Sequence, residues 1–216
     1  MNPAPGAIQN IATIVLAVKP QVAADVMPAV AAMIGSETLV LSVMAGKTLG
    51  FLEAGLPGTA IVRAMPNTPA AIGRGITVAV PNARVTADQQ ARARALLAAS
   101  GSVEWISDET LMDAVTAVSG SGPAYVFLLA EALAKAGAEA GLPEALAAKL
   151  ARETVSGAGE MLHRSQAAAS TLRQNVTSPG GTTAAALEIL MAADGLDPLM
   201  HKAVEAAARR SRELAG

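Results

Sequence analysis

Hydrophobic and polar positions divide the chain into two parts with different periods. In residues 1–105, short β-branched apolar runs alternate with helical stretches, which is typical of a parallel sheet covered by helices. After that point the β-branched runs stop, and alanine-rich stretches with a helical period continue to the C-terminus. The pattern therefore predicts an α/β domain over 1–105 and an all-α domain over 106–216.

The predicted strands are short, and several end at residues that break regular structure. Strands are expected at Ile11–Val18, Leu39–Val43, Ala60–Met65, Ile76–Val80 and Val103–Ile106, with helices at 21–34, 48–54 and 87–99. The first three strands are followed by Lys19-Pro20, Ala45-Gly46 and Pro66-Asn67-Thr68-Pro69. Ligands of open α/β sheets bind where parallel strands end, so these segments are candidates for a ligand site.

The second part contains helices separated by glycine and proline. They are predicted at 108–118, 123–140, 143–163, 168–175, 180–193 and 196–214. Small side chains permit close approach of these helices, and their apolar surface exceeds what one small bundle can bury. The sequence therefore predicts that this domain associates with a second copy of the chain.

Charge and composition exclude several classes of protein. The net charge is -2, and the 16 basic residues are dispersed, so a nucleic-acid surface is not expected. The chain has no cysteine and only two separated histidines, His163 and His201, so neither disulfides nor a metal site is predicted. Charges and Gly/Pro positions interrupt the apolar stretches, and no basic leader is evident, so we expect a cytoplasmic protein without a membrane span.

Two glycine-containing segments precede predicted helices. In Ser178–Thr183 (SPGGTT), backbone N–H groups at a helix N-terminus could hold a carboxylate, although the motif alone fits an ordinary helix start better. Ser119–Pro123 (SGSGP) is a predicted small-residue loop with the same two interpretations. Glu109, Asp113 and Thr116 precede it at helical spacing, either beside such a cradle or on a solvated face. The cationic set Arg209, Arg210 and Arg212 is interpreted as a solvated face.

Four motifs, taken together and in order, resemble the pyrroline-5-carboxylate reductases. They are Ala17–Gln21 (AVKPQ), Arg63–Pro69 (RAMPNTP), Leu111–Tyr125 (LMDAVTAVSGSGPAY) and Val176–Thr183 (VTSPGGTT). The resemblance extends through nearly the whole chain. It implies an incomplete NAD(P)-binding Rossmann-like domain over 1–105 and a helical dimerisation and substrate-binding domain over 106–216. A homodimer, often within a larger ring, is implied as well.

The resemblance also implies an activity. The expected enzyme is an oxidoreductase acting on a C=N bond, which reduces 1-pyrroline-5-carboxylate to L-proline in proline biosynthesis with NADPH or NADH and without a metal. By the same resemblance, Thr116 is the catalytic residue near the ring nitrogen. The implied substrate contacts are Glu109, Val176, Ser178, Gly180, Gly181, Thr182 and Thr183. The implied cofactor contacts are Ala17, Val18, Lys19, Pro20, Met44, Ala45 and Asn175.

The sequence departs from the family pattern at two places. No G-x-G-x-x-G follows a first strand, so weaker cofactor binding through N-terminal truncation is expected. Where many members carry an acid before the cradle, this chain has Ser165–Ala168 (SQAA). The alternative function is a non-catalytic dimeric scaffold or decoy that has lost cofactor binding.

Overall fold

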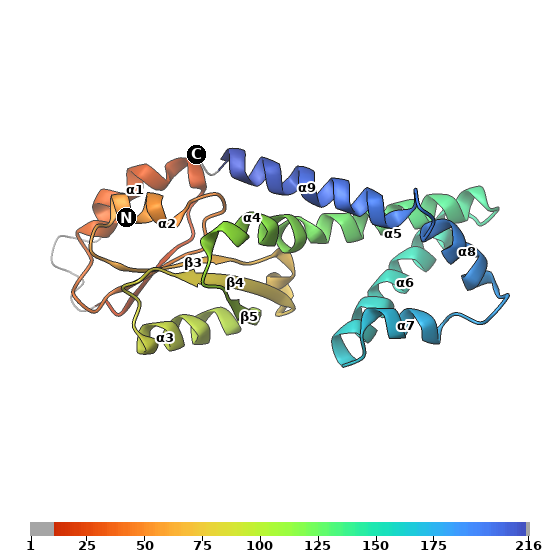
Figure 1. The fold of residues 1–216 in the computed structure, drawn as a ribbon, viewed down its shortest axis with the longest axis horizontal. Coiled ribbons are helices and arrows are strands. Elements are labelled where there is room, and N and C mark those ends of the chain that lie inside the picture. Colours follow the sequence, from red (N-terminus) through yellow and green to blue (C-terminus); the bar gives the residue numbers. More distant parts are fainter. Residues whose placement is uncertain (1–10, 215–216) are drawn as a thin grey trace. The chain divides into compact units, whose positions relative to one another are not determined.

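The computed structural model describes residues 11–214, which fall into two compact units (Figure 1). One unit comprises Met1–Ser121 with Glu205–Gly216, and the other comprises Gly122–Val204. The helical turns that follow the last strand therefore belong with the sheet, as does the end of the last helix. The functional domains predicted at 1–105 and 106–216 remain a prediction.

The first unit contains a five-stranded sheet with the strand order β1-β2-β3-β4-β5. The strands are β1 (Thr13–Leu16), β2 (Leu39–Ser42), β3 (Ala60–Met65), β4 (Gly75–Pro81) and β5 (Gly101–Trp105). Each lies where the apolar runs predict it. Neighbouring strands are parallel except β3 and β4, which are antiparallel. The predicted parallel sheet is thus confirmed for three of its four pairings.

The reversal between β3 and β4 follows from the short connection between them. A parallel crossover needs a dozen or more residues, whereas β3 ends at Met65 and β4 begins at Gly75. The link contains the 3₁₀ turn η2 (Thr68–Ile72), and the Asn67 side chain accepts a hydrogen bond from the Ile76 N–H at 3.0 Å. The proline-containing segment is therefore tied directly to the returning strand.

Helices cover both faces of this sheet (Figure 1). They are the 3₁₀ turn η1 (Pro20–Val22), α1 (Ala23–Ala31), α2 (Leu49–Gly55) and α3 (Ala87–Ala98). On one face Met27 of α1 and Leu52 of α2 pack with Val40. On the other face Ala93 and Leu97 of α3 pack with the neighbouring β2 residues, because alternate side chains of a strand point to opposite faces. Burial on both faces explains why β2 is apolar at consecutive positions.

From Glu109 to Gly120, the chain that leads from β5 to the second unit is helical. It forms the 3₁₀ turn η3 (Glu109–Leu111), α4 (Met112–Val115) and a π-helical turn, η4 (Thr116–Gly120). The Ser121 N–H donates to the Thr116 carbonyl at 2.9 Å and closes the π turn. The loop predicted at Ser119–Pro123 is therefore wrong, because these small residues continue the helix. Met112, only 1% exposed, packs with Val78 and Val80 and fixes α4 on the sheet.

The second unit, Gly122–Val204, consists of helices and the segments that connect them. It contains α5 (Gly122–Glu139), α6 (Glu144–Arg164), α7 (Ala169–Asn175), α8 (Thr182–Leu190) and the first part of α9 (Leu196–Leu214). Helices α5 and α6 pack on each other, and a Cβ on Gly137 would lie 3.3 Å from the Ala147 Cβ. Glycine at this position therefore allows the close approach of the two helices.

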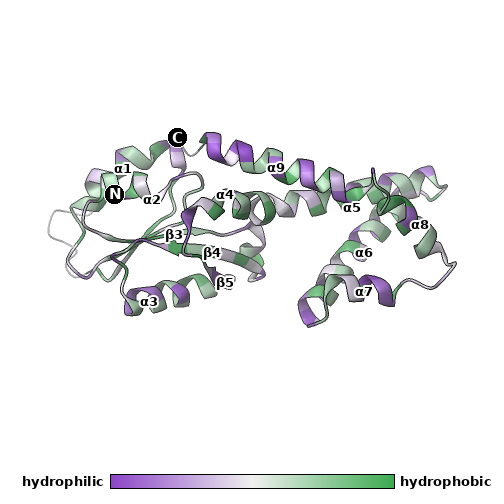
Figure 2. Cartoon of the chain, in the orientation of Figure 1, coloured by the Kyte–Doolittle hydropathy of each residue, from purple (hydrophilic) through white to green (hydrophobic). Residues whose placement is uncertain are grey.

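Helix α5 is rich in apolar residues, as the colouring in Figure 2 shows, and several of its large apolar side chains are exposed within the chain. Phe127 and Leu128 are 64% and 63% exposed. The helical stretch Glu109–Glu139 is long and apolar enough to cross a membrane by length and composition alone, which is weak evidence. An apolar helix face that packs against a second subunit has the same composition.

Candidate active site

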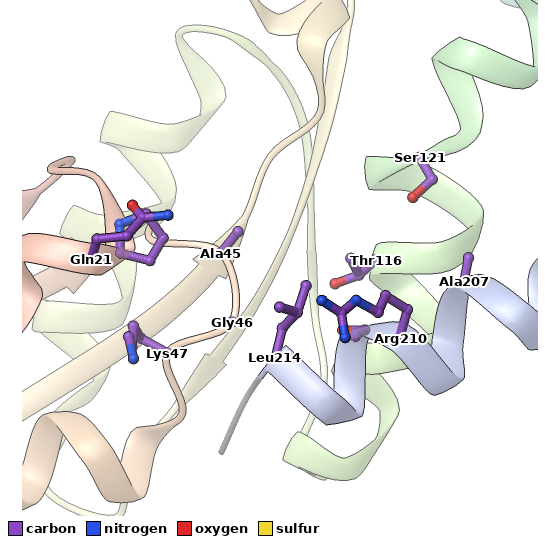
Figure 3. Close-up of a pocket in the computed structure, with 11 residues that line it drawn as sticks. Gln21, Ala45, Gly46, Lys47, Thr116, Ser121, Ala207, Arg210 and Leu214 are labelled. Atoms are coloured by element: carbon purple, nitrogen blue, oxygen red, sulfur yellow. The ribbon is translucent and has the colours of Figure 1, made fainter.

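A cavity of about 540 Å³ opens in the first unit at the edge where β1 and β2 end (Figure 3). The segments after these strands form one side of it, and η4 and the last turns of α9 supply the rest. The lining residues are Pro20, Gln21, Ala45, Gly46, Lys47, Thr116, Ser121, Ala207, Arg210, Ser211 and Leu214. The structure thus brings together three residues predicted for the site, namely Pro20, Ala45 and Thr116.

The turn after β2 lies close to the end of α9. Gly46 has a φ of 72°, and a Cβ at this position would lie 3.3 Å from the Leu214 carbonyl oxygen. Thr48 ends the turn by accepting the Phe51 N–H at 3.1 Å, which starts helix α2. The Lys47 ammonium lies 4.6 Å from the centre of the Phe51 ring. The turn is therefore fixed at its helical end, while its backbone borders the cavity.

The Thr116 hydroxyl is held by its own helix. It donates to the Met112 carbonyl oxygen at 2.8 Å, one turn earlier. Since a hydroxyl has a single proton, its oxygen can then interact with a further group only by accepting a hydrogen bond. This arrangement gives the cavity a neutral acceptor at a fixed position.

The other predicted cofactor residues have different surroundings. Ala17, Val18 and Lys19 follow β1 and are exposed. Met44 is only 3% exposed and belongs to the apolar core, so a ligand in the cavity would meet the turn beside it rather than its side chain. Asn175 is the exposed last residue of α7 in the second unit.

Glu109 has two partners within the first unit. One carboxylate oxygen, Oε1, accepts from the Arg63 guanidinium at 2.5 Å and from the Leu49 N–H at 2.7 Å. The Arg63 side chain is 6% exposed and that of Glu109 is 27% exposed. The predicted substrate contact is thus a residue that already joins strand β3 to the first residue of α2.

The last turns of α9 contribute residues that the sequence did not indicate as part of a site. Arg210 lines the cavity (Figure 3). It also forms an ion pair with Glu213 at 2.8 Å. Its side chain is 66% exposed, which agrees with the predicted solvated face. Helical periodicity alone gives no signal that this face lies beside β2, because that placement depends on tertiary packing.

The predicted carboxylate cradle lies in the second unit, between α7 and α8. Gly180 has a φ of 67°, and the Gly181 N–H donates to the Ser178 carbonyl at 3.0 Å. Gly181 is the N-cap of α8, and Thr182 and Thr183 are its first helical residues. No side chain caps this end of the helix. Backbone N–H groups at these positions have no intrahelical acceptor and suit an anion.

An adjoining groove of about 430 Å³ lies in the same unit. Its lining residues are Arg173, Gln174, Thr177, Ala184, Leu187, Glu188 and Met191. The Thr177 hydroxyl donates to the Arg173 carbonyl oxygen at 2.7 Å and fixes the segment that leads into the cradle. Val176, the first predicted cradle residue, is 61% exposed.

Within residues 11–214, no group of three or more His, Asp or Glu side chains could hold a metal ion. The carboxyl group of Asp108, the residue before Glu109, has a shifted pKa. The Thr110 hydroxyl and the Thr110 N–H both donate to Asp108, at 2.7 and 2.9 Å, and these bonds lower the pKa of this carboxyl below its ordinary value.

Comparison with known proteins places these features in one family. Residues 109–214 match a family described as pyrroline-5-carboxylate reductase dimerisation. The pyrroline-5-carboxylate reductase of Synechocystis sp. is 47% identical over 201 residues, which cover 93% of this chain and 74% of that protein. The reductase structure from Coxiella burnetii has a TM-score of 0.90 at 39% identity and covers 96% of this chain and 77% of its own.

A further structure, from Plasmodium falciparum with NADP bound, has a TM-score of 0.80 at 34% identity, covering 95% of this chain and 78% of its own. Fold and site thus define a self-associating oxidoreductase with a Rossmann-like sheet and a helical dimerisation region. The chain belongs to the pyrroline-5-carboxylate reductase family. It spans 74% to 78% of the length of these relatives.

Proposed function

We propose that this chain carries out the family's reaction, and we propose cofactor and substrate contacts within each unit. As a member of this family, the chain reduces the C=N bond of 1-pyrroline-5-carboxylate to give L-proline, using NADPH or NADH, in proline biosynthesis. The alternative function, a scaffold without activity, is not favoured, because the relatives are named as reductases.

The proposed cofactor contacts are Ala17, Val18, Lys19, Pro20, Met44, Ala45 and Asn175. The cavity volume of about 540 Å³ lies within the range of small-molecule sites. Pro20 and Ala45 border it beyond the ends of two parallel strands, which is where open α/β sheets bind dinucleotides. When bound, the nicotinamide ring supplies the hydride.

The observation that carries the proposal is the orientation of the Thr116 hydroxyl. Because its proton is donated to the Met112 carbonyl, its oxygen is an acceptor for any ligand. The substrate nitrogen carries a proton in the reactive iminium form and can donate it to such an oxygen. Thr116 would thereby hold the protonated ring nitrogen while the neighbouring carbon receives the hydride, and that proton stays on nitrogen in the product.

The proposed carboxylate contacts are Val176, Ser178, Gly180, Gly181, Thr182 and Thr183. Glu109 is a further contact that the resemblance implies. The N-terminus of α8 presents N–H groups and the positive end of the helix dipole. The Thr183 hydroxyl is the additional donor predicted there. Anchoring the carboxylate limits rotation of the small ring and thus aligns its C=N carbon.

Replacement of Thr116 tests the assignment. Thr116→Val keeps the shape but removes the oxygen, so kcat should fall about 10- to 100-fold, the equivalent of one hydrogen bond to a charged group. Thr116→Ser should retain most of the activity. The control Thr171→Val, at an exposed position on α7, should behave as wild type. Wild-type kcat in Thr116→Val would show that the nitrogen binds elsewhere.

We also propose the functional division into a nucleotide-binding part, 1–105, and a dimerisation and substrate-binding part, 106–216. The match of 109–214 to the dimerisation family supports this division. The protein is a soluble enzyme, as its relatives are. We propose the cytoplasm as its compartment and a ring of dimers as its assembly.

A further inference from the structure

Glu109 and Arg63 form a buried polar connection that the reaction described above does not use. The Arg63 side chain projects from β3 and is only 6% exposed. A charge buried to this extent needs a paired group, and Glu109 provides one at 2.5 Å. The same oxygen of Glu109 also accepts the Leu49 N–H at 2.7 Å, at the first residue of α2. One atom therefore connects three segments of the first unit.

Two of these segments, the start of α2 and the helical run from Glu109, adjoin walls of the cavity. The turn Ala45–Lys47 ends at Thr48, immediately before Leu49, so the Glu109 contact restrains the end of this turn. On the other side, Glu109 begins the helical run that continues through α4 to Thr116. Leu49 also packs with Met112 in an apolar cluster, which reinforces the connection. The Glu109 carboxylate is thus a direct polar link between the end of the turn and the helical run that carries Thr116.

We propose that Glu109 and Arg63 are positioning residues, which hold the cofactor turn and Thr116 in register with each other, and that Glu109 acts through these contacts rather than by binding substrate. The geometry supports this role because both donors to Oε1 come from the protein itself. The proposal rests on the assignment of Ala45 and Thr116 to the site. Removal of the charge would loosen the spacing of the reacting groups, and an error of about 1 Å in such spacing costs about 100-fold in rate.

The test compares the same substitution, glutamate to glutamine, at two residues. Glu109 contacts the first residue of α2, and Glu53 lies near its other end. Glu109→Gln removes the charge that faces Arg63 and Leu49. Glu53→Gln is the matched control, because Glu53 lies near the other end of α2 and accepts a neutral hydrogen bond from the Asn82 side chain at 2.9 Å. Arg63→Met and Arg63→Lys complete the set, the second retaining the positive charge.

Turnover is measured with NADPH and 1-pyrroline-5-carboxylate, and exchange of the amide hydrogens of residues 44–49 is followed in the same proteins. In Glu109→Gln and Arg63→Met, kcat should fall about 10-fold or more, KM for NADPH should rise, and exchange in 44–49 should accelerate. The double variant should be no worse than either single one, since both remove the same contact. Arg63→Lys should recover part of kcat, and Glu53→Gln should match wild type.

Two results would overturn the proposal. If exchange in 44–49 accelerates while kcat stays at the level of Glu53→Gln, the pair only stabilises the fold. If only KM for 1-pyrroline-5-carboxylate changes in Glu109→Gln, this residue contacts the substrate directly. Wild-type turnover in Thr116→Val would instead refute the site assignment itself, so the two failures are distinguishable. Should Arg63→Met fail to fold, Glu109→Gln and Arg63→Lys still decide the question.

Discussion

The hydroxyl of Ser211 donates a hydrogen bond of 2.6 Å to the carboxylate of Asp113, 98 residues earlier in the chain. Ser211 lies in the last turns of α9 and is only 8% exposed, while Asp113 lies one helical turn before Thr116. Both residues belong to the first compact unit. This bond therefore attaches the C-terminal wall of the cavity to the helix that carries the proposed catalytic hydroxyl.

We expect Ser211→Ala to lower the free energy of unfolding by about 1–3 kcal/mol, because it leaves a partly buried carboxylate without its donor. Ser165→Ala is the control, since Ser165 only accepts a hydrogen bond from the nearby Ala167 N–H at an exposed position. It should change stability by less than about 0.5 kcal/mol. Urea unfolding followed by circular dichroism measures both. Equal effects would mean that the Asp113 contact contributes nothing specific.

Gly101 should tolerate no side chain. Its φ is 141°, and a Cβ would lie 1.9 Å from the Gly75 carbonyl oxygen, which belongs to the adjacent strand. Gly101→Ala should therefore force β4 and β5 apart and destabilise the protein by about 3 kcal/mol or more. Gly58→Ala is a useful comparison, because Gly58 has a φ of 78° but no atom within 4 Å of the added Cβ. It should cost only about 1 kcal/mol of backbone strain.

Thermal unfolding and the yield of folded protein distinguish these two glycine variants. A Gly101→Ala protein as stable as Gly58→Ala would show that the two strands are not this close in solution. A large loss in both would indicate that backbone strain, rather than steric conflict, dominates.

The apolar patterns could predict all five strands but not the direction of β4. Direction depends on how the segment after Met65 turns back, and two prolines identify a loop without specifying its path. The roles of Arg63 and Glu109 were likewise beyond sequence reasoning. Arg63 stands in an otherwise apolar strand, and its partner is 46 positions away, so no periodic signal links them.

The candidate site was predictable in part. Three residues that the resemblance implies, Pro20, Ala45 and Thr116, line one cavity, and their roles there stay predictions. The contribution of Arg210 and Ser211 could not be predicted, because an amphipathic helix shows which face is polar but not which strand end it approaches. The loop predicted at Ser119–Pro123 is wrong, because helical structure precedes and follows these glycines and serines and continues through them.

Self-association should depend on the exposed face of α5. Phe127→Asp should reduce the mass measured by light scattering to that of a monomer, since a charge at an apolar interface is costly to bury. Its effect on the chain's own packing should be small, because the phenylalanine is 64% exposed. Ile72→Asp, at a position 77% exposed in the first unit, is the matched control and should remain associated. Dissociation of the control alone would place the interface elsewhere.

The lowered pKa of Asp108 predicts a loss of stability in acid. A carboxyl whose pKa is lower in the folded than in the unfolded protein stabilises the fold above its unfolded pKa, and this contribution disappears as the pH falls through the folded pKa. The side-chain bond from Thr110 is the largest cause. In Thr110→Val the carboxyl should therefore titrate at higher pH, while the backbone bond retains part of the shift. Carbon-detected NMR titration of Asp108 measures this change, and an unchanged midpoint would contradict it.

The continuous helical run from Glu109 to Gly120 makes this site sensitive to insertions and deletions as well as to substitutions. Its start is held by Arg63 and its middle by Ser211, and Thr116 follows at a fixed helical rotation. One residue inserted between Asp113 and Thr116 would rotate the hydroxyl by about 100° about the helix axis. No exchange of neighbouring side chains could restore its direction, so the spacing of this segment is as much a part of the site as the residues themselves.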